Sequence, residues 1–114
     1  MRLPNAAIAV IDAAKVRDYL LSHDHRDGRS KARFFGRLGF SQAGWLSLRD
    51  QLLAVARDGE AELVEPGAYG QKYVVRGMIQ GPSGRAAVVV TVWIVLRGEE
   101  APRFVTAYPG EAFR

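Results

Sequence analysis

The sequence contains no cysteine, which excludes disulfide bonds, thiol nucleophiles and thiolate metal ligands. Only two histidines are present, His23 and His25, so a metal site of nitrogen and sulfur ligands lacks a third member. No apolar run approaches the roughly 20 residues that cross a bilayer. The first fifteen residues lack the apolar centre and cleavage site of a signal peptide. We therefore expect a cytoplasmic protein with no membrane segment, no metal and no cofactor.

The overall composition is that of an ordinary globular protein. It has 114 residues, of which 48% are hydrophobic and 25% are charged. That length is enough to enclose one core, and no repeat or linker divides it. We expect a single domain over residues 1–114.

Positive charge is concentrated in one half of the sequence. The net charge is +4, and residues 1–57 hold 10 Lys and Arg against 5 Asp and Glu. Residues 58–114 hold 6 against 7. A localised basic region on a small domain suits a nucleic acid or another polyanion. A solvated basic face that keeps the protein soluble explains the charge equally well.

The two halves also differ in predicted structure, because the first reads as helical and the second is rich in Val, Ile, Tyr and Phe. Turn sequences separate four apolar runs in the second half, and Gly77 suggests a bulge in one of them. The predicted helices are 13–22 after an Asp12 cap, 29–38 before Gly39, and 42–57 between Ser41 and Gly59. The predicted strands are 61–65, 71–79, 85–96 and 103–108. This order predicts an α+β fold, with about three helices packed on an antiparallel sheet of about four strands.

The stretch HDHRDGRSKARFF, residues 23–35, places four cations around the expected start of the second helix. A helix N-terminus carries partial positive charge and favours acidic residues instead. On a helical projection Lys31 falls within the apolar face, so it either reaches past the helix end or sits in a partly buried site with a partner. A histidine, a glycine turn, a helix N-terminus and cations together form a natural phosphate site, and His25 can transfer protons near neutral pH.

Three side chains of the predicted strands are ambiguous. Trp93 and Tyr108 can stack on nucleic-acid bases, although a tryptophan in a Val-rich and Ile-rich strand more often belongs to the core. Thr106 shares a side with Tyr108 by strand alternation, and its hydroxyl can contact a phosphate. A threonine in a strand, however, usually reflects the β-propensity of this residue type.

Several short motifs resemble, in their order and spacing, those of a small bacterial family catalogued as domain of unknown function 6883. The motifs are LPNA, KVRDYLL, HRDGRSKARFF, YGQKYVV and WIVLRGEEAPRFVTAY, and they run from Leu3 to Tyr108. The resemblance implies a toxin of a bacterial toxin–antitoxin or competition system. The helix-then-sheet order is more remotely similar to ribonuclease toxins of the barnase, colicin and RelE kind, which cleave RNA without metal.

The leading hypothesis from residues and resemblance together is a metal-independent endoribonuclease. In it the ribose 2′-hydroxyl attacks the adjacent phosphate, His25 acts as general base or acid, Lys31 stabilises phosphoryl charge and Thr106 positions the phosphate. The expected partners are RNA, either tRNA or mRNA, and a cognate antitoxin or immunity protein. The alternative is a non-catalytic nucleic-acid-binding, regulatory or immunity-type protein. The residues expected to bind flanking phosphates and bases are Lys15, Arg29, Arg33, Arg97, Arg103 and Tyr108.

Overall fold

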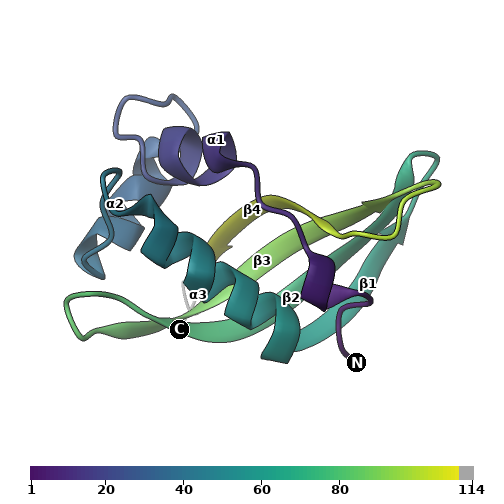
Figure 1. Ribbon diagram of the computed structural model, residues 1–114. Coiled ribbons are helices and arrows are strands. Elements are labelled where there is room, and N and C mark those ends of the chain that lie inside the picture. Colours follow the sequence, from purple (N-terminus) through teal and green to yellow (C-terminus); the bar gives the residue numbers. More distant parts are fainter. Residues whose placement is uncertain (111–114) are drawn as a thin grey trace.

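The protein is described here by a computed structural model, which describes residues 1–110. Its helices precede its strands, which confirms the α+β prediction (Figure 1). The helical elements are the 3-10 turn η1 (Ala6–Ile8), α1 (Ala13–Lys15), the π-helical turn η2 (Val16–Leu20), α2 (Arg29–Arg37) and α3 (Trp45–Asp58). The strands are β1 (Glu60–Pro66), β2 (Gly70–Gln80), β3 (Ala86–Leu96) and β4 (Arg103–Pro109).

The four strands form one antiparallel sheet in the order β1-β2-β3-β4, so each strand pairs with its neighbour in the sequence. The sheet is irregular at two places, in β1 between Leu63 and Glu65 and where β4 pairs with β3 at Val92 and Trp93. The predicted bulge at Gly77 is wrong, because β2 keeps continuous register with β3 through this residue. A Cβ at Gly77 would lie 3.0 Å from the Val55 side chain, so the glycine gives α3 room against the sheet.

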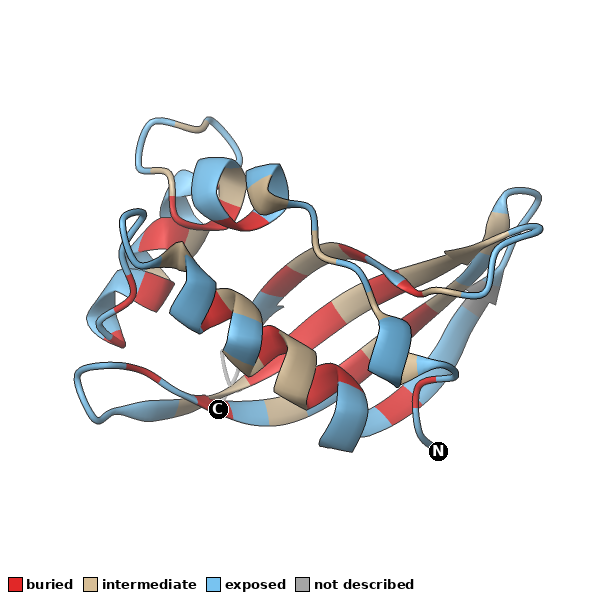
Figure 2. Cartoon of the chain, viewed as in Figure 1, coloured by how far each residue is buried: buried red, intermediate tan, exposed pale blue. Residues whose placement is uncertain are grey.

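The core lies between α3 and the sheet. Leu48, Leu52 and Val55 form the buried stripe of α3, as the helical spacing predicts. Figure 2 shows the buried residues gathered on the face of β2 and β3 that α3 crosses. Trp93 is completely buried, and its indole N–H donates to Thr91 Oγ1, which in turn donates to the Val75 carbonyl. The core interpretation of Trp93 is therefore confirmed.

The helix boundaries differ from the predictions mainly at the starts and in the first helix. Helix α3 begins three residues later than expected, because Ser41 Oγ accepts from the Gly44 N–H in a turn that precedes the helix. Asp12 caps α1 as predicted, by accepting from the Ala14 N–H at 3.0 Å. The rest of that helix, however, is the wider turn η2.

Helix α2 ends as the sequence indicates. Gly39 has a φ of +97°, and the N–H groups of Gly39 and Phe40 donate to the carbonyls of Gly36 and Phe35. This is the Schellman arrangement, in which a left-handed glycine closes the helix. None of the helices within residues 1–110 combines the length and apolar composition that a membrane span requires.

Candidate functional site

Tyr19 lies at the centre of a cluster that joins η2, the turn before α2, α2 itself and β4. Its hydroxyl shares a hydrogen bond of 3.2 Å with Thr106 Oγ1. Its ring packs edge-on against the His25 imidazole, with 5.0 Å between ring centroids. The Lys31 ammonium lies over the same ring, 5.7 Å from its centroid. Tyr19 thus brings together His25, Lys31 and Thr106, which are the three residues predicted to be catalytic.

The local sequence places Tyr19 in this position through its neighbours. Val16 and Leu20 are completely buried and anchor η2 in the core. The Leu21 N–H donates to the Val16 carbonyl at 3.0 Å, which closes a turn one residue wider than an α-helical one. The Tyr19 side chain is left half-buried beside β4. The contact of η2 with β4 therefore includes the hydroxyl of Tyr19.

His25 is held by two backbone hydrogen bonds to the same ring nitrogen. Its Nδ1 accepts from the N–H of Asp27 at 3.0 Å and from the N–H of Gly28 at 3.1 Å. A neutral imidazole has one donor and one acceptor nitrogen, so these bonds assign the proton to Nε2. His25 consequently satisfies two N–H groups at the start of α2 and presents an N–H donor from the other side of its ring.

Gly28 lets the start of α2 approach Tyr19 closely. A Cβ at this position would collide with the Tyr19 carbonyl and come within 3.2 Å of the tyrosine ring. The Gly28 backbone has an ordinary φ of −94°, so space and not conformation requires the glycine. The glycine of the turn before α2 is thus also a packing contact of the cluster.

A cavity of about 470 Å³ opens beside this cluster. Five of its seven lining residues have polar or titratable side chains, and three of these five belong to the cluster. Lys15 is exposed at this cavity, whereas Tyr19, His25 and Thr106 are half-buried. The lining comprises Asp12, Ala14, Lys15, Tyr19, His25, Val105 and Thr106.

Helix α2 carries strong positive charge with no neutralising partner in residues 1–110. It has no acidic residue in its first turn, and none of the ion pairs found there involves it. Arg29 and Arg33 are exposed, while Lys31 is half-buried against Tyr19. The group that Lys31 packs against is therefore the aromatic face of Tyr19, which attracts a cation without neutralising it.

Three residues predicted to bind RNA lie apart from the cluster. Arg97 follows β3 and borders a hollow formed with the β1–β2 turn, at the end of the sheet away from α2 (Figure 1). Arg103 donates to both carboxylate oxygens of Glu99, at 2.9 and 3.2 Å, and this partner raises the pKa of the guanidinium. Tyr108 pairs across from Val90 near the end of β4. Within residues 1–110, none of these three side chains makes a hydrogen bond or ring contact with Tyr19 or lines its cavity.

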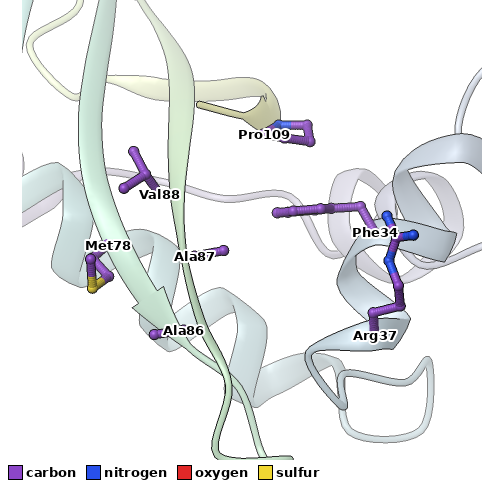
Figure 3. Close-up of a pocket in the computed structure, with 7 residues that line it drawn as sticks. All are labelled: Phe34, Arg37, Met78, Ala86, Ala87, Val88 and Pro109. Atoms are coloured by element: carbon purple, nitrogen blue, oxygen red, sulfur yellow. The ribbon is translucent and has the colours of Figure 1, made fainter. Parts of the chain in front are cut away.

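A second hollow, of about 650 Å³, lies between α2 and the β2–β3 hairpin (Figure 3). Phe34 points across it toward Ala87 and Pro109, and Arg37 is its only charged lining residue. The other lining residues are Met78, Ala86 and Val88. This surface has no nucleophile and no proton-transfer group, so the cavity beside Tyr19 is the candidate site.

Sequence reasoning missed two residues of the site. Tyr19 lies three residues after Val16 and one before Leu20, a spacing that indicates an apolar helical stripe, and its hydroxyl gives no signal of the long-range partner. Asp12 was predicted only as a helix cap, a role it has. The available hint that Asp12 borders the site was its position three residues before Lys15, because both residues lie at the same short helix.

Comparison with known proteins supports the fold and the family. A chain of the contact-dependent growth inhibition toxin–immunity protein complex from Klebsiella pneumoniae 342 superimposes with a TM-score of 0.69 at 23% sequence identity. The superposition covers 91% of this chain and 95% of that chain, and it shows that the two share a fold. A search of curated proteins finds no match. The family described as "Domain of unknown function (DUF6883)" matches residues 2–111, and the chain therefore belongs to this family.

Proposed function

We propose that the protein is an endoribonuclease that needs no metal ion and acts as a toxin of a bacterial competition or toxin–antitoxin system. The observation that carries the proposal is the Tyr19 cluster, since one side chain contacts His25, Lys31 and Thr106 from three parts of the chain. These residue types supply hydrogen-bond donors and positive charge at one place. A phosphodiester anion is the group that such a set of donors recognises.

The proposed reaction is attack of a ribose 2′-hydroxyl on its own 3′-phosphate, which leaves a cyclic phosphate and a free 5′-hydroxyl. Lys31 stabilises the charge that grows on the phosphoryl oxygens in the transition state. The Nε2–H of His25 and the hydroxyl of Thr106 orient the phosphate. Lys15, which lines the cavity, and Arg29 and Arg33, which are exposed on α2, bind flanking phosphates.

The toxin role and the partner are proposals supported by the shared fold. The solved neighbour is a chain of a toxin–immunity protein complex. We infer that this protein likewise has a cognate protein partner, an antitoxin or immunity protein, and that RNA is its substrate. The concentration of cations on α2 suits both a nucleic acid and an acidic inhibitor that competes with it.

A second candidate function is a non-catalytic one, either nucleic-acid binding or an immunity-type role. The observation that favours it is that the solved complex contains a toxin and its immunity protein, and both roles are compatible with the shared fold. A binding protein would retard RNA at low salt and lose affinity steeply as salt rises, but would produce no fragments. An immunity-type protein would bind no RNA at all.

The test is incubation of purified protein with total cellular RNA in EDTA, read on a denaturing gel. We expect discrete fragments from the wild type and none from His25→Ala or Lys31→Ala. Circular dichroism and thermal melting of both variants provide the folding control. Intact RNA in every lane refutes the ribonuclease, and gel retardation at several salt concentrations then distinguishes the two non-catalytic roles.

A further inference from the structure

The 2′-hydroxyl must lose a proton during the proposed reaction, and His25 is badly placed to accept it. Both backbone donors point at Nδ1, so the neutral ring already carries its proton on Nε2, the nitrogen on the other side of the ring. A further proton would have to enter at Nδ1, where it would displace the N–H groups of Asp27 and Gly28. In this tautomer the ring donates a hydrogen bond but does not act as a base.

Asp12 is the other side chain at the cavity that can accept a proton as a base. It is the only carboxylate among the cavity's lining residues, and those residues all belong to the described part of the chain. Its Oδ1 accepts from the Ala14 N–H. Its Oδ2 has no hydrogen-bond partner within residues 1–110, which leaves a carboxylate oxygen available at the wall of the cavity. The cap fixes this side chain on the first turn of α1, so the free oxygen is held in place.

We propose that Asp12 is the proton acceptor of the reaction, an inference that rests on the proposed ribonuclease function. The 2′-oxygen gives its proton to the Asp12 carboxylate while it forms the new bond to phosphorus. The bond from phosphorus to the 5′-oxygen breaks, and the leaving oxygen keeps the electron pair and takes a proton from the Lys31 ammonium. Solvent water then carries the proton from Asp12 back to Lys31, which restores both groups.

Asp12→Asn separates this role from the helix cap, because an asparagine oxygen still accepts from the Ala14 N–H. We expect kcat to fall by about 10²–10⁴-fold, the range for loss of a general base, with KM and the melting temperature close to wild type. A wild type that cleaves RNA beside an Asp12→Asn variant that cleaves within a few-fold of it overturns the role of Asp12 and leaves the ribonuclease standing. A wild type that cleaves nothing overturns both.

Two further measurements keep a structural role of Asp12 apart from a chemical one. Added formate or acetate should partly restore the turnover of Asp12→Ala, because a small carboxylate can replace a base but cannot replace a covalently positioned cap. Failure of both acids to raise its turnover, while the variant remains folded, counts against the proposal. The ¹⁵N chemical shifts of the His25 ring should show the Nε2–H form, and an Nδ1–H form would return the role of base to His25.

Discussion

Two stretches of β4 differ in whether the nearby cations have a carboxylate partner. At the start of the strand, Arg103 has a carboxylate partner in Glu99. Further along, Thr106 shares a hydrogen bond with Tyr19. The cations of α2 next to this pair form no ion pair with a carboxylate within residues 1–110. The sequence places basic residues near both stretches. Within residues 1–110, Lys31, Arg29 and Arg33 beside the second stretch have no carboxylate partner and can receive an anion from outside.

The difference shows that whether a basic side chain can bind an anion depends on its partner in the fold, and not only on its presence in the sequence. Arg17 pairs with Asp18 and Arg49 with Asp50, as Arg103 does with Glu99, and all three pairs lie at the surface. Such exposed pairs contribute little to stability, and they leave the arginine less available to a phosphate. Lys31 instead rests on an aromatic ring, which attracts a cation but does not pair with it as a carboxylate does. Substitution of a cation that has a carboxylate partner and of one that has none should therefore have different effects on RNA cleavage.

The largest expected contrast is between Lys31 and Arg103. Lys31→Ala should lower the rate of RNA cleavage by about 10²–10³-fold, the cost of losing one transition-state donor. Arg103→Ala should change it by no more than about twofold, because only an exposed ion pair is lost. Initial rates on one labelled oligoribonucleotide measure both. Similar losses in the two variants would show that the distinction between paired and unpaired cations is wrong.

The next contrast concerns two glycines of the same region. Gly28→Ala should lower the free energy of unfolding by about 1–3 kcal/mol, because its methyl group collides with Tyr19 and forces η2 and α2 apart. Gly36→Ala has no atom within 4 Å of the new Cβ and should raise that free energy by about 0.5–1 kcal/mol. Urea denaturation measures both values. A neutral Gly28→Ala would mean that the cluster tolerates a looser contact than the structure describes.

A smaller effect is expected for the exposed arginines of α2. The affinity for a 2′-O-methyl oligoribonucleotide, which lacks the attacking hydroxyl, should fall as salt rises. Arg29→Ala and Arg33→Ala should each reduce the slope of log affinity against log salt by about 0.7, the value for one contact to a single strand. Arg49→Ala, whose arginine pairs with Asp50, is the matched control and should leave the slope unchanged. Fluorescence anisotropy at four salt concentrations measures these slopes.

The smallest expected effect concerns pH. The hydrogen bonds from Arg17 lower the pKa of Asp18 below its ordinary value. A carboxyl group with a lower pKa in the folded state stabilises the fold above its unfolded pKa, and this contribution is lost as pH falls through the folded value. An NMR titration of the Asp18 carboxyl should therefore show a midpoint that rises toward the ordinary value in Arg17→Ala. An unchanged midpoint would mean that the pair does not persist in solution.

The sheet could be predicted well from the sequence because its signals are local. Each strand is a Val-rich or Ile-rich run between turn sequences, and each pairs with the next, so no long-range information was needed. The charge of Lys31 on an apolar face left two alternatives, a side chain that reaches past the helix end or a partly buried site with a partner, and the structure has the second. Gly77 was harder, since a glycine in a strand fits a bulge and a close approach equally well. Only the position of Val55 on α3 distinguishes them.

The candidate site could be predicted only in part because its contacts are not local. His25 and Lys31 are close in sequence, but nothing in the sequence pairs Tyr19 with Thr106, and an apolar helical stripe is the ordinary place for a tyrosine. The hydrogen bonds to Nδ1 of His25 depend on the shape of a turn, which residue types do not specify. Glu99 lies four residues before Arg103, but their pairing depends on the turn between β3 and β4.

The hydrogen bond between Tyr19 and Thr106 spans 87 residues of the chain. One consequence concerns the cell that makes the protein. During synthesis, the segment that carries Tyr19, His25 and Lys31 leaves the ribosome long before β4 exists, so the nascent chain has no complete cluster. Any activity of the cluster begins only after the last strand is released and docks. If the proposed toxin role holds, a producing cell therefore has the whole time of translation to supply the proposed neutralising partner.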